Sequence, residues 1–140
     1  MFLLDTNVVS ELRKAKSGKA DGNVVAWANT IPVSKMFLSS ITVLELEAGI
    51  LLAERRDPAQ GSILRAWLEA RVLPTFADRV LPVDTAVALR CAKLHVPNPR
   101  PERDALIAAT ALVHGMCMVT RNVEDFQATG VGILNPWLGP

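Results

Sequence analysis

Short, largely apolar runs alternate along this chain with longer stretches of helical pattern, and this alternation is the strongest constraint on its fold. Five runs have the length of strands and lie at residues 1–4, 35–40, 79–83, 116–120 and 131–137. Helices are expected between them at residues 6–14, 23–31, 41–56, 61–76, 85–95 and 103–115. Strands that alternate with helices predict an α/β domain of three layers, in which helices flank a mostly parallel central sheet.

Size and composition restrict the class of protein further. The chain has 140 residues, half of them apolar, which is enough for a single domain over residues 1–140 with its own core. Its net charge of +1 means that any contact with a polyanion must come from a local patch. Cys91 and Cys117 match no disulfide or metal-ligand spacing, so we expect reduced core residues. No stretch resembles a membrane span or a leader, which predicts a cytoplasmic protein without membrane contact.

Capping residues and prolines suggest where several elements end. Ser39 and Ser40 are good N-cap types before the helix at 41–56, and Pro101 suits the first turn of the helix at 103–115. Pro82 removes a backbone donor from the third strand, which we therefore expect at an edge of the sheet. Residues 121–126 are expected to form a polar turn.

An aspartate follows the first apolar run directly, in the sequence "MFLLDTNVVSEL". Asp5 therefore lies where a buried strand ends and a helix begins. In parallel α/β sheets, ligands bind beyond the carboxyl ends of the strands. Asp5 is either a helix cap or part of such a site, and the polar segment after the strand at 116–120 is expected at the same edge.

Two further acids share helical faces with apolar residues. Glu45 lies at helical spacing from Ile41, Leu44, Ala48 and Leu52, and Asp104 lies on the small-residue face of its own helix. Taken singly, Asp104 is explained by the helix dipole and Glu45 by a reach to solvent. Burying unpaired carboxylates costs several kcal/mol, however, so their coincidence with Asp5 favours a shared cleft.

Such a group of carboxylates would repel itself without a cation. Asn122 and Asp125 follow the strand at 116–120 and extend the set of oxygen donors. Oxygen ligands without histidine or cysteine at ligand spacing favour a hard ion, Mg²⁺ or Mn²⁺. A site of this kind suits phosphodiester hydrolysis by a metal-activated water.

Taken together, these segments resemble the PIN-domain ribonucleases, and among them the VapC and FitB toxins of bacterial type II toxin-antitoxin pairs. The similarity covers essentially the whole chain and rests on an ordered set of segments: "LLDTNVVSEL", "SSITVLELEAGI", "RDALIAATALVHG", "VTRNVEDF" and "LNPW". It implies a PIN-like, Rossmann-like fold, endoribonuclease activity with Mg²⁺ or Mn²⁺, and a homodimer. It also implies a small cognate antitoxin, through which alone the toxin would contact operator DNA.

Carried over by position, the resemblance places Asp5, Glu45 and Asp104 at the first three acidic sites of the family. We expect Asp5 and Asp104 chiefly to hold the metal, and Glu45 to help orient the attacking water. The fourth acid matches either Asn122 or Asp125. Because an amide supplies no negative charge, we expect Asp125 to serve and Asn122 to orient ligands.

Two other readings remain at this point. A signalling receiver domain is also small and acidic at its strand ends, but Asp5 is followed by threonine rather than a second acid, and "TRN" offers no lysine. A catalytically weak PIN-like module, acting mainly by binding its antitoxin and DNA complex, is the alternative that Asn122 keeps open. Binding of Mn²⁺ would separate this module from the nuclease.

Overall fold

The computed structural model describes residues 1–140. Its centre is a five-stranded sheet with the order β3-β2-β1-β4-β5, and every pair of neighbouring strands is parallel. The strands are β1 (Phe2–Leu4), β2 (Met36–Ser39), β3 (Val80–Leu81), β4 (Cys117–Val119) and β5 (Ile133–Leu134). The predicted α/β class with a mostly parallel sheet is therefore confirmed, as is the edge position of the third strand.

Eight α-helices surround the sheet. They are α1 (Thr6–Arg13), α2 (Gly22–Thr30), α3 (Ser40–Arg56), α4 (Pro58–Trp67), α5 (Leu73–Thr75), α6 (Thr85–Leu94), α7 (Glu102–His114) and α8 (Val123–Phe126). A π-helical stretch, Leu68–Val72, joins α4 to α5. Single 3-10 turns lie at Ala15–Ser17, Val33–Lys35, Gln127–Thr129 and Pro136–Leu138.

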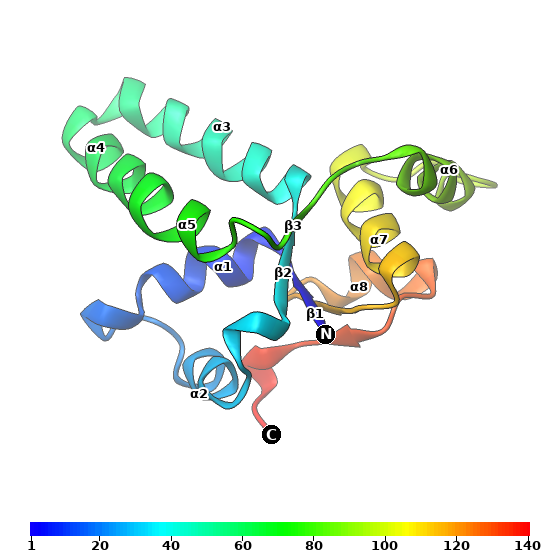
Figure 1. The fold of residues 1–140 in the computed structure, drawn as a ribbon, viewed down its shortest axis with the longest axis horizontal. Coiled ribbons are helices and arrows are strands. Elements are labelled where there is room, and N and C mark those ends of the chain that lie inside the picture. Colours follow the sequence, from blue (N-terminus) through cyan, green and yellow to red (C-terminus); the bar gives the residue numbers. More distant parts are fainter.

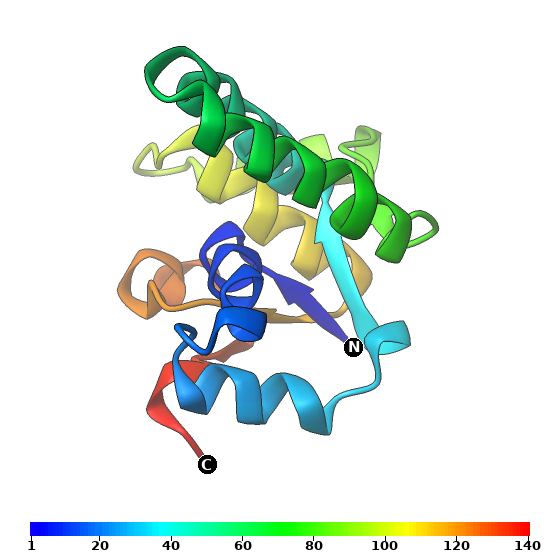
Figure 2. The ribbon, with the colours of Figure 1, turned by 90° about the vertical axis from the view of Figure 1, so that its left-hand side faces the viewer.

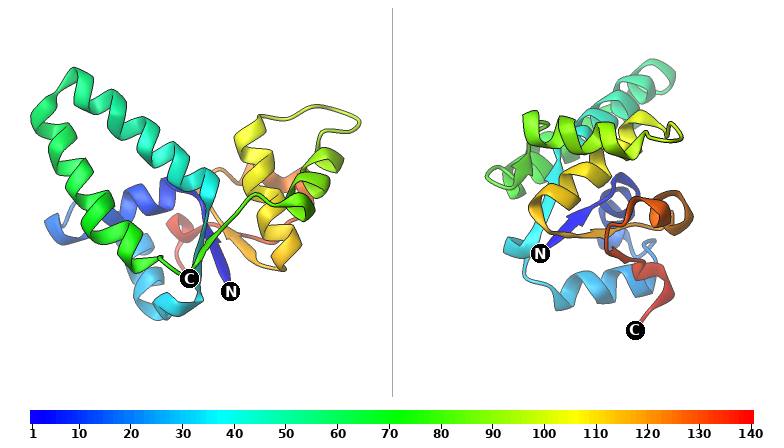
Figure 3. Two further views of the ribbon diagram at one scale, coloured as in Figure 1. Left: turned by 45° about the horizontal axis from the view of Figure 1, so that its top comes forward. Right: turned by 90° about the vertical axis from the view of Figure 1, so that its right-hand side faces the viewer.

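The helices form a layer on each side of the sheet. Figure 1 shows α1 and the antiparallel pair α3 and α4 on one side, with α7, α8 and α6 on the other. Figure 2 looks onto the first of these layers, where α2 lies below α1. The right panel of Figure 3 looks onto the second, in which α6 lies against α7 on the outside. The three layers expected from the alternation of strands and helices are present.

Side chains of the central strands divide between two cores because successive residues of a strand point to opposite faces. Leu4 and Val119 are register neighbours and pack with α1, α3 and the π-helical stretch. Leu3 and Met118, one residue earlier on each strand, pack with α7 and α8. Both faces of the sheet are thus covered, which explains the continuous apolar runs of the sequence.

The helical segment expected at 61–76 begins earlier than its apolar pattern suggested. Asp57 accepts a hydrogen bond from the Gln60 amide at 3.3 Å, and Pro58 occupies the first position of α4. Gly61 then lies against α3, where an added Cβ would come 2.6 Å from the Cα of Glu54. Asp57 and Gly61 together allow the tight antiparallel turn between α3 and α4.

Two local expectations were wrong. Residues 121–126 are not only a turn, because Val123–Phe126 form the short helix α8, anchored by the buried Phe126. Pro101 is the N-cap residue before α7 rather than a member of its first turn. Phe126 packs in the core and thereby stabilises α8, whereas the start of α7 differs from the expected position by a single residue. None of the helices combines the length and the apolar character required to span a bilayer.

Candidate active site at the carboxyl edge of the sheet

The two central strands, β1 and β4, end side by side at the point where the strand order reverses. From β1 the chain proceeds outward to β2 and β3, whereas β4 is followed by β5 on the other side. Open α/β sheets bind ligands at such a switch point, beyond the carboxyl ends of the strands. Asp5 follows β1 there, and Thr120 follows β4.

Asp5 is held in place by neighbours from both strands. One of its oxygens, Oδ1, accepts a hydrogen bond from the Thr6 amide at 2.8 Å, which caps α1. The other oxygen, Oδ2, accepts from the Thr120 hydroxyl at 2.8 Å. Only 6% of Asp5 is exposed. Asp5 is thus both a helix cap and a buried carboxylate at the sheet edge, so the two readings of this residue do not exclude each other.

Glu45 reaches the same edge from the second turn of α3, which begins where β2 ends. The Thr6 hydroxyl donates to Glu45 Oε1 at 2.7 Å, which links α1 to α3. The apolar stripe assigned to Glu45 from the sequence was partly wrong, because Leu44 and Leu52 are 45% and 58% exposed. The core-facing side of α3 carries Leu46 and Ile50 instead, and Glu45 lies half-buried at the border between the two sides.

Asp104 approaches from the opposite layer. Helix α7 precedes β4 and runs antiparallel to it, so its first turn lies at the carboxyl edge of the sheet. The side chain of Asp104 is half-buried and takes no part in the hydrogen bonds that hold Asp5. The buried residues Ala105, Ile107 and Ala108 fix the orientation of this turn.

The last two candidates lie after β4 and differ in position. Asp125, in the first turn of α8, lines a cleft together with Asp104, Arg100 and Pro101. The backbone amide of Asn122 donates to the Thr120 hydroxyl at 3.0 Å. Asn122 also lines a neighbouring exposed hollow together with Asp125. Asp125 therefore adds a negative charge beside Asp104, whereas Asn122 holds the Thr120 hydroxyl through its backbone amide.

The charges of this group affect one another. Burial raises the pKa of Asp5, and the carboxylates of Glu45 and Asp125 raise it further, whereas the hydrogen bonds from Thr120 and Thr6 act in the opposite direction. Burial also raises the pKa of Asp104, with additional contributions from Asp5, Asp125 and Glu45. None of these four acids forms an ion pair with a lysine, arginine or histidine. No basic side chain therefore neutralises these carboxylates through an ion pair.

The donor set fits a hard divalent cation. All four side chains offer carboxylate oxygens, and no cysteine or histidine takes part. No three of these carboxylates bring an oxygen each within 4.8 Å of the others, so they form an open cup rather than a closed cage. Mg²⁺ favours such a setting because it retains several of its waters and binds through one or two carboxylates.

Thr6 is a site residue that was not predicted from the sequence. Its backbone amide binds Asp5 and its hydroxyl binds Glu45, so one residue positions two of the acids. Its place directly after Asp5 was visible in the sequence, but its link to a residue 39 positions away was not.

Comparison with known proteins places the chain in a family. The family model described as PIN domain matches residues 2–131. The protein named VapC ribonuclease Y4jK from Sinorhizobium fredii is 39% identical, and the alignment covers 98% of each chain. Toxin FitB of Neisseria gonorrhoeae is 36% identical over 98% of this chain and 99% of its own.

Solved structures agree with this placement. The crystal structure of FitAcB from Neisseria gonorrhoeae superposes with a TM-score of 0.88 at 36% identity, covering 98% of this chain and 99% of that one. The DNA-bound VapBC from Salmonella typhimurium gives a TM-score of 0.74 at 26% identity over 96% and 97% of the two chains. Because similarity of sequence and of fold both extend over nearly the whole length, the chain belongs to the PIN-domain family.

Proposed function

We propose that residues 1–140 act as one PIN-like nuclease domain, the toxin of a toxin-antitoxin pair, which hydrolyses RNA in the cytoplasm. The observation that carries this proposal is the set of four carboxylates at the sheet edge, from β1, α3, α7 and α8, without a basic partner. The relatives named VapC ribonuclease and Toxin FitB support the choice of RNA as substrate and the toxin role.

Asp5 and Asp104 would chiefly hold Mg²⁺ or Mn²⁺. They are the two carboxylates whose pKa is raised by burial and by the neighbouring acids, so a cation relieves more repulsion here than elsewhere in the chain. When bound, the ion would neutralise charge on the phosphodiester and lower the pKa of a water. Thr6 and Thr120 keep the ligand oxygens in place through the hydrogen bonds described above.

Glu45 and Asp125 have a different role in this proposal. Their carboxylates accept hydrogen bonds from the attacking water and orient it toward phosphorus. Addition of water to phosphorus breaks one P–O ester bond, which leaves a phosphomonoester on one RNA fragment and a hydroxyl group on the other. Asn122 orients ligands through its amide and supports Thr120.

Substitution of the two proposed metal ligands tests this assignment. Asp5→Asn and Asp104→Asn should each reduce cleavage of RNA by about 10²-fold or more, while circular dichroism shows a folded protein. Titration of the wild type with Mn²⁺ in a calorimeter should show binding that both variants lose. Full activity of a purified, folded Asp5→Asn protein would refute the assignment. Absence of Mn²⁺ binding at millimolar concentration would favour the catalytically weak module.

The partners follow from the relatives rather than from this chain alone. The structures of FitAcB and of DNA-bound VapBC are complexes, and we infer a small cognate antitoxin for this protein, through which it contacts operator DNA. Inducing the chain in cells without an antitoxin should stop growth and generate new RNA ends, and mapping these ends would identify the target. Normal growth with an unchanged RNA population would contradict the toxin role.

The homodimer stays a prediction. Its support here is the exposure of Leu44, Leu51 and Leu52 on α3, which are 45%, 52% and 58% exposed. Sedimentation should give twice the mass of one chain, and a double Leu51→Gln, Leu52→Gln variant should sediment as a monomer. A wild-type monomer at micromolar concentration would argue against the homodimer.

A further inference from the structure

A second group of potential ligands lies outside the acidic cup, between α6 and α7. Cys91 lies on α6, and His95, four residues later, is the C-cap residue of that helix, so the two side chains lie on the same face. Glu102, the first residue of α7, faces them because α6 and α7 pack along each other through Val87 and Ala105. Cys91, His95 and Glu102 each bring one ligand atom within 4.8 Å of the other two.

The spacing of these atoms is close to that of three corners of a zinc tetrahedron. Ligand atoms at about 2.1 to 2.3 Å from a tetrahedral ion lie roughly 3.4 to 3.8 Å from one another. The distances are 3.7 Å from Cys91 Sγ to His95 Nε2, 3.9 Å from Sγ to a Glu102 oxygen, and 3.1 Å from Nε2 to the other Glu102 oxygen. Small rotations of the three side chains would complete the geometry.

The chemical nature of the group also selects the ion. A thiolate, an imidazole and a carboxylate together favour Zn²⁺, whereas the all-oxygen cup at the sheet edge favours Mg²⁺ or Mn²⁺. Cys91 is buried, while the side chains of His95 and Glu102 are 22% and 70% exposed. The group is thus open to solvent on one side, where a water can take the fourth position.

We propose that Cys91, His95 and Glu102 form a second metal site, which binds Zn²⁺ through three protein ligands and ties the end of α6 to the start of α7. This site is independent of the proposed ribonuclease activity, because it shares no residue with the acidic cup. Glu102 and Asp104 are two positions apart on α7 and so point in different directions from the helix.

Binding of the ion has a structural consequence at the loop between the helices. The Arg100 amide donates to His95 Nδ1 at 3.1 Å, so the proton of the neutral ring is on Nε2 and points at Glu102. An ion at Nε2 replaces this proton, and the remaining ring proton then belongs on Nδ1. The Arg100 amide must release the ring, and its NMR resonance therefore reports occupancy of the site.

Cobalt provides the test because Co²⁺ occupies zinc sites and gives an absorption band when bound to a thiolate. Metal-free, reduced full-length protein should develop a thiolate-to-cobalt band that saturates near one equivalent and disappears on addition of Zn²⁺. Excess Mg²⁺ should not displace it, and Zn²⁺ should shift the Arg100 amide resonance. Cys91→Ser should abolish the band, whereas the matched variant Cys117→Ser should retain it.

Three further variants keep the result interpretable. Glu102→Gln changes an exposed side chain, so the fold survives, and the affinity for Co²⁺ should fall at least about tenfold. Asp5→Asn and Asp104→Asn should retain the thiolate band even where RNA cleavage is lost, which separates this site from the proposed function. Absence of the band in the wild type at millimolar Co²⁺ would overturn the proposal and leave the trio as a hydrogen-bonded link between helices. A band that depends on Cys117 would overturn it as well.

Discussion

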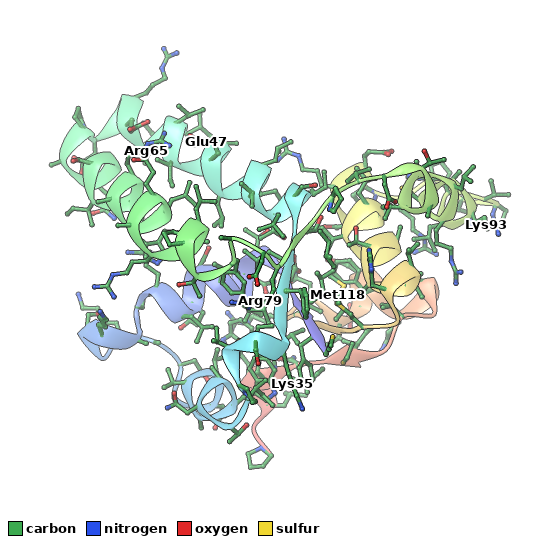
Figure 4. All side chains as sticks on the ribbon, in the orientation of Figure 1. Lys35, Glu47, Arg65, Arg79, Lys93 and Met118 are labelled. Carbon is green, nitrogen blue, oxygen red and sulfur yellow. The ribbon has the colours of Figure 1, made fainter.

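Two clusters of carboxylates involve helix α3, and they differ in whether a positive charge lies among them. In the first, Arg65 of α4 binds Glu47 through two hydrogen bonds of 2.5 and 2.6 Å and Glu54 at 3.0 Å. Figure 4 shows Arg65 and Glu47 facing each other between α3 and α4. In the second, Glu45 lies with Asp5, Asp104 and Asp125, and none of these acids forms an ion pair with a basic side chain. Glu45 and Glu47 are only two positions apart on α3, with Leu46 between them.

The pKa values respond to these surroundings in opposite directions. The hydrogen bonds that Arg65 donates lower the pKa of Glu47, and the bonds that Arg65 donates to Glu47 and Glu54 raise its own pKa. At the sheet edge, burial and neighbouring acids raise the pKa of Asp5 and Asp104. Glutamates that share an arginine form a structural link between helices, whereas carboxylates without an ion-pair partner favour the proposed cation site.

The sharpest comparison uses the two neighbouring glutamates themselves. Glu45→Gln should reduce RNA cleavage by about 10²-fold, which corresponds to roughly 2.7 kcal/mol of transition-state stabilisation. Glu47→Gln makes the same chemical change on the same helix and should leave cleavage within about twofold of the wild type. Initial rates on a fluorogenic RNA measure both. Equal loss of activity in the two variants would contradict the separation of the clusters.

Binding of Mn²⁺ should give the next largest effect, on stability. At about 100 times its dissociation constant, a ligand that binds only the folded state adds roughly 2.7 kcal/mol to the free energy of unfolding. Wild type should show this gain in thermal denaturation, and Asp5→Asn should lose it. Arg65→Ala, distant from the edge, is the control and should keep the gain. Stabilisation of Asp5→Asn equal to that of the wild type would place the ion elsewhere.

Removal of the arginine tests the compensated cluster. Arg65→Ala leaves Glu47, Glu54 and the more distant Glu69 without their cation, and we expect the melting temperature to fall by roughly 2 to 5 °C. Arg65→Lys should recover part of this loss, because lysine supplies the charge without the two parallel bonds. Both variants should retain RNA cleavage at a temperature where they are folded. An unchanged melting temperature for Arg65→Ala would show that the pairing contributes nothing to stability.

The smallest expected effect has the opposite sign. Without metal, Asp104→Asn should raise the melting temperature at neutral pH by about 1 to 3 °C, because the substitution removes repulsion between carboxylates. The rise should be small because solvent already screens part of that repulsion. The folded-state pKa of Asp104 lies above its ordinary value of 3.8, so the folded protein binds this proton more tightly than the unfolded chain does. The stabilisation that the protonated carboxyl provides is present below pH 3.8 and is lost as pH rises through the folded-state pKa.

The difference between Asp104→Asn and the wild type should therefore vanish below pH 3.8 and grow toward neutral pH. Saturating Mn²⁺ should reverse the order of the two proteins, because only the wild type gains from the ion. Melting curves at several pH values, with and without Mn²⁺, measure both effects. A variant less stable than the wild type in metal-free buffer at neutral pH would mean that Asp104 is not repelled by its neighbours.

Much of the fold was predictable because its signals are local. Apolar runs of four to five residues, Ser39 as a cap and Pro82 as a strand breaker each act within a few positions, and the strand order confirmed the edge position of β3. The start of α4 and the existence of α8 were missed. Both depend on contacts made in three dimensions, namely the packing of Gly61 against α3 and the burial of Phe126.

The candidate site was only partly predictable for the same reason. The sequence predicted Asp5, Glu45, Asp104 and Asp125 as site residues, and their roles remain predictions. It did not reveal Thr6, whose two contacts join α1 to α3, nor the group formed by Cys91, His95 and Glu102. Cys91 was expected to be an ordinary core residue, because its surroundings are apolar and it matches no disulfide or metal-ligand spacing. Its partner Glu102 lies beyond a turn that contains several prolines, so their proximity was not visible in the sequence.

The class of fold and the chemical character of the candidate site follow from local patterns, since periodicity dictates helix or strand and residue type dictates charge. Which charges meet follows instead from how the elements pack. The pairing of β1 with β4 brings Asp5 into contact with Thr120, 115 positions away in the sequence. The orientation of α3 places Glu45 at the sheet edge and Glu47 against Arg65. Such outcomes depend on packing between distant segments, because electrostatic energy depends on separation in space and on burial rather than on separation along the chain.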